Sequence, residues 1–171
     1  MEYTHSYSSP LGDILLASGG EALTGLRFEA RGDSDRPLSG ERMKKSLPVF
    51  EQTRKWLDMY FSGREPDFTP PLRMAGTDFQ LAVWNLLLQI PYGETAAYGE
   101  LARRIAAQRG IPRMSAQAVG GAVGRNPIPI IIPCHRVIGA NGSLTGYGGG
   151  IDRKVKLLAL EKATGTEAMM Q

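Results

Sequence analysis

The chain has 171 residues, 42% apolar and 22% charged, with a formal net charge of +3, a balance typical of a soluble globular protein. No apolar run approaches the ~20 residues that span a bilayer, and Met1–Pro10 lacks the basic-then-apolar pattern of a signal peptide, so we expect a cytoplasmic protein without membrane contact. One cysteine excludes an internal disulfide, and with only two histidines we expect no metal site.

Three short β-prone runs open the chain, at residues 3–7, 13–18 and 23–28. Turn-forming residues, including Pro10, Gly12 and Gly19-Gly20, separate the runs. A polar loop is expected at residues 30–40. Ser46 then resembles an N-cap, with Pro48 in the first turn of a helix that Gly63 ends. These elements predict a small N-terminal α/β domain, a three-stranded antiparallel sheet plus a helix, over residues 1–72.

Three prolines and a glycine in residues 66–76 predict a linker, and a second domain is expected over residues 77–165. Thr77 and Gln80 form a capping-box pattern before an apolar helix that ends at Pro91. Helices are also expected at residues 98–108, 113–124 and 152–162. The helices expected at residues 98–108 and 113–124 are separated by a tight break at residues 109–112. They have the outline of a helix-turn-helix, although a plain αα-hairpin is the commoner arrangement.

Charge divides unevenly between the two halves. Residues 1–76 carry ten Lys/Arg against eleven Asp/Glu, whereas residues 77–171 carry ten against six, a net charge of +4. The basic half weakly indicates polyanion binding, and a solvated basic surface is the ordinary alternative. Gly120 and Gly121 fall in the middle of a predicted helix, where each costs roughly 1 kcal/mol relative to alanine. Close packing or the close approach of a ligand backbone must offset that cost.

The segment 126–150 contains the single cysteine. We expect the apolar run 128–132 to be a buried, extended segment that leads to Pro133, Cys134, His135 and Arg136. A thiolate is the nucleophilic form of cysteine, and a neighbouring base or positive charge activates it. In an extended segment His135 would point away from Cys134 and act through backbone curvature or a bridging water. A buried structural cysteine and a structural histidine are the alternative interpretation.

Four motifs resemble those of the O6-alkylguanine-DNA alkyltransferase family, also called methylated-DNA–protein-cysteine methyltransferases. They are IPYGETAAYGELA at 90–102, AVGGAVGRNP at 118–127, PCHRVIG at 133–139 and LTGYGGGIDRKVKLLALE at 144–161. The motifs span most of residues 77–162 in the family's order and spacing, whereas residues 1–70 resemble the family's N-terminal domain more weakly. The resemblance implies a ribonuclease-H-like N-terminal domain and a mostly helical C-terminal domain that contains a winged-helix-like helix-turn-helix.

The resemblance also implies a function. A monomer would bind double-stranded DNA in the minor groove, flip out an O6-alkylguanine, and transfer the alkyl group irreversibly to Cys134 without a cofactor. His135 matches the residue that takes the thiol proton through water, and Glu161 the carboxylate that orients it. Tyr98 matches a proton donor to guanine N3, and Asn126 a residue that supports the active-site turn. The implied contacts to substrate or DNA come from Gln117, Ala118, Gly120, Gly121, Arg125, Val137, Tyr147 and Gly148. Whether O4-alkylthymine is also a substrate stays open.

Two positions depart from the family pattern. Gln117 stands where the family commonly has an arginine that fills the gap left by the flipped base, so we expect weaker DNA binding or slower repair than an arginine would give. Gly148 stands where some members have serine, and we expect little effect because the backbone donor remains.

Three other functions compete with this hypothesis. A recognition-only relative would lack the acceptor cysteine, so the presence of Cys134 argues against it, whereas Gln117 at the usual arginine position keeps this alternative open. A transcription regulator would need long polar side chains on its recognition helix, where this chain has glycines. A cysteine hydrolase usually brings its cysteine and histidine together from distant positions in the sequence, whereas Cys134 and His135 are adjacent.

Overall fold

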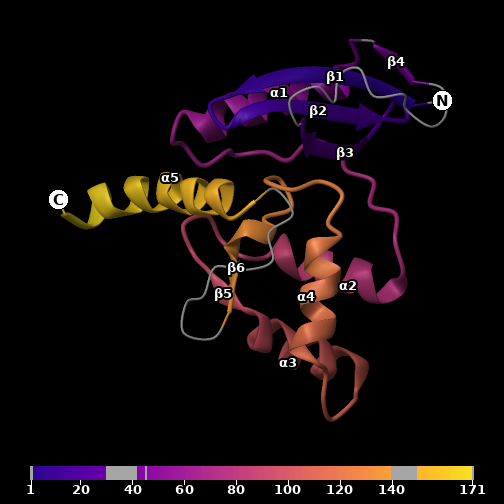
Figure 1. The fold of residues 1–171 in the computed structure, drawn as a ribbon, viewed down its shortest axis with the longest axis vertical. Helices are drawn as coiled ribbons and strands as arrows, with labels where there is room; N and C mark the ends of the chain where they lie inside the picture. The colour runs from indigo at the N-terminus through magenta and orange to yellow at the C-terminus, as the bar shows by residue number, and fades with distance from the viewer. Residues whose placement is uncertain (1, 30–41, 45, 140–149, 171) are drawn as a thin grey trace. The chain divides into compact units, whose positions relative to one another are not determined.

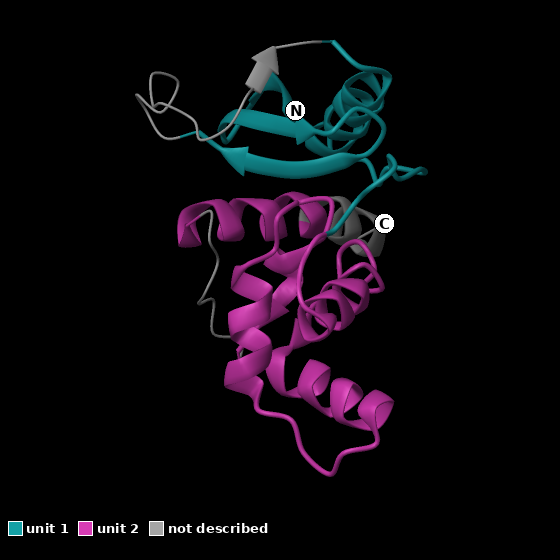
Figure 2. Cartoon of the chain, turned by 90° about the vertical axis from the view of Figure 1, so that its right-hand side faces the viewer, with its two compact units in different colours: residues 1–74 teal, residues 75–171 magenta. Residues whose placement is uncertain are grey.

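The structure is a computed structural model that describes residues 2–29, 42–44, 46–139 and 150–170, with side chains described up to Lys162 and not at 42–44. The chain divides into two compact units, residues 1–74 and residues 75–171 (Figures 1 and 2). Among the described residues, no helix combines the length and the apolar character that a membrane crossing requires.

A mixed sheet forms one layer of the first unit, with strand order β3-β2-β1-β4. The strands β1 (Glu2–Ser9), β2 (Gly12–Ser18) and β3 (Leu23–Phe28) pair antiparallel, as the turn residues predict. Gly12 has a φ of 123°, which the turn between β1 and β2 requires of a glycine. A fourth strand that the sequence did not predict, β4 (Arg42–Lys44), pairs parallel with β1. The expected polar loop at residues 30–40 lies outside the described residues.

Helix α1 (Pro48–Phe61) packs on the sheet of the first unit through its apolar face, which includes Phe50, Leu57 and Tyr60. The prediction that Ser46 caps this helix is wrong. The N-cap is Leu47, because Pro48 occupies the first helical position and so places the helix start one residue later than predicted. The side chain of Leu47 makes no cap hydrogen bond. The first unit therefore has the predicted sheet-plus-helix core with a differently built helix start.

The proline-rich segment after α1 makes contacts of its own. Leu23 donates to the Pro71 carbonyl at 2.7 Å and accepts from the Arg73 N–H at 2.9 Å, so residues 71–73 lie along the start of β3. The division between the two units follows, between Met74 and Ala75.

The second unit is mostly helical. It begins with α2 (Asp78–Leu87), whose Thr77–Gln80 capping box forms as predicted. The next helix, α3 (Tyr98–Arg109), ends at Gly110, which has a φ of 65° and closes the helix in the left-handed conformation. Helix α4 (Ala116–Gly124) starts three residues later than expected because Ser115 is its N-cap and accepts from the Ala118 N–H.

A short pair of strands and a C-terminal helix also belong to the second unit. Strands β5 (Ala96–Ala97) and β6 (Val137–Ile138) form a short parallel pair that the sequence did not predict. Helix α5 (Ile151–Met170) runs beyond the predicted end at residue 162 (Figure 1). The β5–β6 pair joins the start of α3 to the segment that follows Cys134, so it positions the site.

Candidate active site

A tight turn precedes Cys134. The Ile132 N–H donates to the Ile128 carbonyl at 2.9 Å, and Ile130 has a φ of 75°. The prediction that residues 128–132 are extended is therefore wrong, although the run is largely buried as expected. A β-branched residue is strained at positive φ, and its complete burial is what holds it there.

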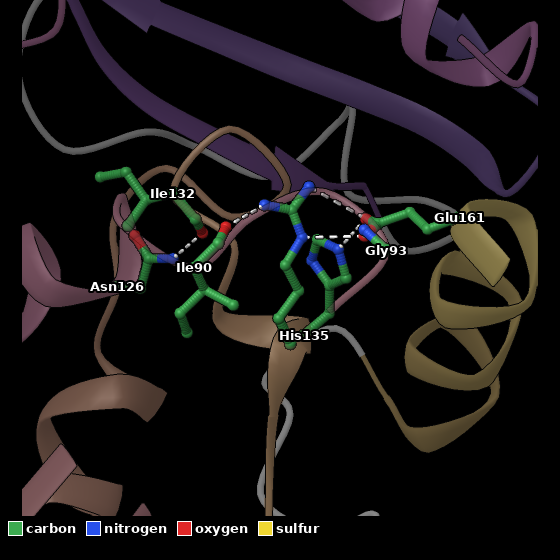
Figure 3. A network of polar contacts seen from close by, with 7 residues as sticks. Ile90, Gly93, Asn126, Ile132, His135 and Glu161 are labelled. Carbon is green, nitrogen blue, oxygen red and sulfur yellow. Dashed lines mark hydrogen bonds and ion pairs between the residues drawn. The ribbon is translucent and has the colours of Figure 1, made fainter. Parts of the chain in front are cut away.

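Asn126 supports this turn through both the nitrogen and the oxygen of its amide, and Figure 3 shows the bond from its nitrogen to Ile132. Its Nδ2 donates to the Ile132 carbonyl at 2.7 Å, and its Oδ1 accepts from the Ile128 N–H at 3.0 Å. An alanine in its place would leave both buried backbone groups to find other partners. Asn126 thus fixes the backbone that leads directly into Pro133 and Cys134.

Cys134 begins a short 3-10 helix, η2 (Cys134–Arg136), and not an extended segment as predicted. The reason is local, since the Arg136 N–H donates to the Pro133 carbonyl at 3.0 Å and closes a turn. Cys134 is 5% exposed. Burial raises the pKa of its thiol from 9.0 to about 11, although a hydrogen bond from Asn126 and the charge of Lys154 act in the opposite direction. The thiol is therefore protonated at neutral pH and needs a base to become a nucleophile.

His135 and Glu161 are paired in the interior (Figure 3). The His135 Nε2 lies 2.6 Å from Glu161 Oε2, with His135 completely buried and Glu161 1% exposed. The other carboxylate oxygen, Oε1, accepts from the Gly93 N–H at 3.0 Å. The carboxylate thus fixes which way the imidazole faces and leaves Nδ1 as the nitrogen on the other edge of the ring.

Arg136 shares the same carboxylate. Its Nε donates to Glu161 Oε1 at 2.8 Å and its Nη2 to Oε2 at 3.3 Å, while Nη1 donates to the Ile90 carbonyl at 2.7 Å. The sequence analysis placed Arg136 beside the thiol as an activating charge. The structure instead pairs it with Glu161, which is 25 residues further along the chain.

The ionisation of this pair follows from burial and charge. Burial alone would raise the pKa of Glu161, but the hydrogen bonds and charges of His135 and Arg136 outweigh it and lower that pKa from 4.5 to about 2. Burial lowers the pKa of His135, with the charges of Arg136 and Lys154 acting in the same direction and Glu161 against them. The imidazole is therefore neutral at pH 7 and can accept a proton.

Lys154 is a completely buried cation that the sequence analysis missed. Its Nζ donates to the Val137 carbonyl at 2.6 Å and lies 6.0 Å from the centre of the Tyr98 ring. Lys154 is the fourth residue of α5. The neighbouring sequence does not indicate its role, because its partners, Val137 and Tyr98, lie on two other elements. His135, Arg136, Lys154 and Glu161 are called the buried polar cluster below.

Tyr98 connects this cluster to helix α4. It is the first residue of α3, directly after β5, and a Cβ atom added at Gly120 would meet its ring at 3.7 Å. Burial raises the pKa of Tyr98, and the charge of Cys134 acts in the same direction. Its hydroxyl therefore keeps its proton at neutral pH, and its ring lies next to both Gly120 and Lys154.

Several predicted DNA-contact residues lie on helix α4 or directly after it. Gln117, Ala118, Gly121 and Arg125 are exposed along and just after α4. A Cβ atom at Gly121 or Gly124 would meet nothing within 4 Å, so packing inside the chain does not explain these glycines. Gln117, Ala118, Gly121 and Gly124 are called the α4 face below. Tyr147 and Gly148 lie outside the described residues. Among the described residues, no group of three or more His, Cys, Asp or Glu side chains could hold a metal ion.

Comparison with known proteins agrees with both units. Residues 3–74 match the family model described as "6-O-methylguanine DNA methyltransferase, ribonuclease-like domain", and residues 78–163 match "6-O-methylguanine DNA methyltransferase, DNA binding domain". A methylated-DNA–protein-cysteine methyltransferase of Haemophilus influenzae is 45% identical over 94% of this chain and 86% of its own length. One from Methanosarcina acetivorans is 46% identical over 93% of this chain and 97% of its own length.

The fold agrees as well. The crystal structure of Mycobacterium tuberculosis OGT in complex with DNA matches with a TM-score of 0.80 and 46% identity, covering 95% of this chain and 94% of that one. The mixed α/β class expected from the sequence is therefore confirmed. With both family models together covering nearly the whole sequence, this chain belongs to the 6-O-methylguanine DNA methyltransferase family.

Proposed function

We propose that this protein is a methylated-DNA–protein-cysteine methyltransferase that repairs DNA by transferring the alkyl group of O6-alkylguanine to Cys134. Family membership and the names of the relatives support the reaction type. The observation that carries the proposal is the placement of a buried, protonated thiol directly before a histidine whose ring is fixed by a buried carboxylate. That arrangement suits a nucleophile that is activated once.

In this mechanism the Cys134 thiol gives its proton through a water to Nδ1 of His135, and Glu161 stabilises the imidazolium that forms. The thiolate attacks the alkyl carbon, a carbon–sulfur bond forms, and the carbon–O6 bond breaks with its electron pair left on guanine. Tyr98 donates a proton to N3 of the leaving base and recovers one from the imidazolium through solvent. The products are guanine and a thioether, which is stable, so each molecule reacts once.

DNA is the proposed partner, bound in the minor groove by the α4 face, with the damaged nucleotide flipped toward Cys134. The glycines of this face support the proposal because intramolecular packing does not account for them, whereas a sugar-phosphate backbone lying against the helix would. Gln117, in the first turn of α4, would fill the space of the flipped base, and Arg125 would contact a phosphate. Asn126 would hold the turn. The carbonyls of Cys134 and Val137 would accept hydrogen bonds from the guanine amino group. The Val137 carbonyl already accepts from Lys154 and would use its second lone pair for guanine.

The domain assignment and the monomeric state are part of the same proposal. Residues 77–165 would carry DNA binding and alkyl transfer, and residues 1–72 would form a separate N-terminal domain. One copy would suffice, because every residue with a proposed role in the transfer is in one chain.

Incubation with a DNA duplex that contains one O6-methylguanine tests the function. Intact-mass spectrometry should show a gain of one CH2 unit, and peptide mapping should place it on Cys134. Cys134→Ala is the matched control and should show no gain. Damage-selective binding without a mass gain would make the protein a recognition factor, and the absence of both binding and transfer would overturn the DNA-repair proposal.

A further inference from the structure

Arg136 and His135 share a single negative charge. Both oxygens of Glu161 accept from the guanidinium of Arg136, at 2.8 and 3.3 Å, and Oε2 also lies 2.6 Å from His135 Nε2. All three side chains are buried. Arginine carries its charge at every pH at which proteins are folded. The carboxylate therefore already has a full positive partner while the imidazole is neutral.

The geometry points to Arg136 as a positioning residue that keeps His135 neutral until the thiol proton reaches it. The inference rests on the proposed function, because it concerns the base of that reaction. Without the guanidinium, the buried carboxylate would have only the imidazole to balance its charge, and the pKa of His135 would rise against the burial that lowers it. A protonated imidazole cannot accept the proton of Cys134.

The other groups around His135 do not replace Arg136 in this role. From α5, Glu161 favours the imidazolium and Lys154 opposes it. Cys134 is protonated, and burial raises the pKa of Tyr98, so that its phenol is neutral. The ring of Tyr92 lies 5.6 Å from the guanidinium carbon of Arg136. Lys154 donates to the Val137 carbonyl at 2.6 Å. Arg136 donates to both oxygens of the carboxylate that would otherwise favour protonation of the histidine.

A purely structural role is the competing explanation, because Arg136 also donates to the Ile90 carbonyl and so ties together three segments of the unit. Charge and shape can be separated experimentally. Arg136→Gln keeps an N–H donor but loses the charge, whereas Arg136→Lys keeps the charge but loses the fork of donors. Arg136→citrulline, introduced by chemical ligation at the chain's single cysteine, keeps the planar shape, the Nε donor to Glu161 and one terminal NH2 donor for the Ile90 carbonyl. It loses the charge and the second terminal donor, which a carbonyl oxygen replaces.

The direct readout is the protonation state of His135. Nitrogen NMR of the imidazole measures it between pH 5 and 8 in the full chain without DNA. The chain has only two histidines, so His5→Gln assigns the two rings. We expect the pKa of His135 to lie below its ordinary value in the wild type and in Arg136→Lys. In Arg136→Gln and Arg136→citrulline its pKa should rise by about 1–3 units. An unchanged pKa of His135 in the citrulline variant would overturn the inference. This test does not depend on whether Arg136→Gln folds.

The second readout is the rate of methyl transfer against pH in single-turnover reactions. The charge-deficient variants should lose rate at pH 7, and the loss should shrink by about tenfold for each unit that the pH is raised, until His135 is again neutral. A rate lowered equally at every pH would overturn the inference in favour of a structural role. Failure of the wild type to transfer methyl would overturn the proposed function, while the NMR titration would still report on Arg136.

Discussion

The buried polar cluster and the α4 face belong to the same unit but are built in opposite ways. The cluster consists of buried polar side chains whose hydrogen bonds are already made in the protein alone, among His135, Arg136 and Glu161 and from Lys154 to the Val137 carbonyl. The α4 face consists of small residues and one amide, exposed, with open space where side chains would be. The chemical groups are thus organised in the protein alone, whereas in the proposed function the α4 face would gain its interactions only when DNA binds. Substitutions in the cluster should therefore change stability, and substitutions on the face should change binding.

The largest effect is expected for Glu161→Gln. It removes the negative partner of Arg136 in the interior, and breaking a buried ion pair in this way costs roughly 3–5 kcal/mol. Denaturant unfolding measures the loss. Glu51→Gln is the matched control, because Glu51 pairs with Arg54 at the same 2.8 Å but is about half exposed, so its removal should cost far less stability. Equal losses in the two variants would mean that burial does not separate the two pairs.

Acid should affect the cluster next. The pKa of Glu161 is about 2 in the folded state and near 4.5 when unfolded, so the stabilisation by this carboxylate is complete above pH 4.5 and is lost as the pH falls toward 2. His135, with its pKa lowered by burial, adds a loss in the same direction below its ordinary 6.5. Unfolding experiments at a series of pH values should show a steeper acid decline in the wild type than in Glu161→Gln. Parallel declines would contradict the assignment of the low pKa to Glu161.

Gly121→Ala should separate stability from binding on the α4 face. Alanine gains roughly 1 kcal/mol over glycine within a helix, and the added Cβ atom meets nothing within 4 Å, so the variant should be more stable than the wild type. If a DNA backbone lies against this position, the same methyl group should weaken binding, which a DNA titration measures. A variant that is stabilised and binds DNA with unchanged affinity would show that the backbone does not approach Gly121.

The smallest change in stability is expected for Gln117→Arg, an exposed substitution that should stay within about 0.5 kcal/mol. DNA affinity should increase, and the slope of log affinity against log salt should steepen by about one charge. Measuring binding at several salt concentrations tests this directly, with Gln117→Lys as a control that has charge but no planar guanidinium. Unchanged affinity and transfer rate in Gln117→Arg would mean that this position does not limit either step.

Local patterns predicted the elements whose cause is local. The turns between β1, β2 and β3, and the Thr77–Gln80 capping box, depend on residues a few positions apart, and the structure contains them. The start of α1 was wrong because two neighbouring signals, Ser46 and Pro48, implied different first residues, and the proline determined the outcome.

The interior of the site was harder to predict because its partners are far apart in sequence. The β5–β6 pair joins Ala96 to Val137, and the roles of Arg136 and Lys154 depend on Glu161 and the Val137 carbonyl. No spacing rule connects such positions. The shape of the Cys134 segment was missed for a related reason, since the apolar run suggested a strand whereas Asn126 bonds it into a turn.

The burial of Cys134 also determines how long an unused molecule lasts. With a thiol pKa of about 11, the thiolate fraction at pH 7 is on the order of one in ten thousand, and the sulfur is 5% exposed. Peroxides and other cellular oxidants react with exposed thiolates, so this sulfur should resist conversion to sulfenic acid. Because each molecule reacts only once, burial should keep its single thiol reduced and reactive until the protein meets a damaged base.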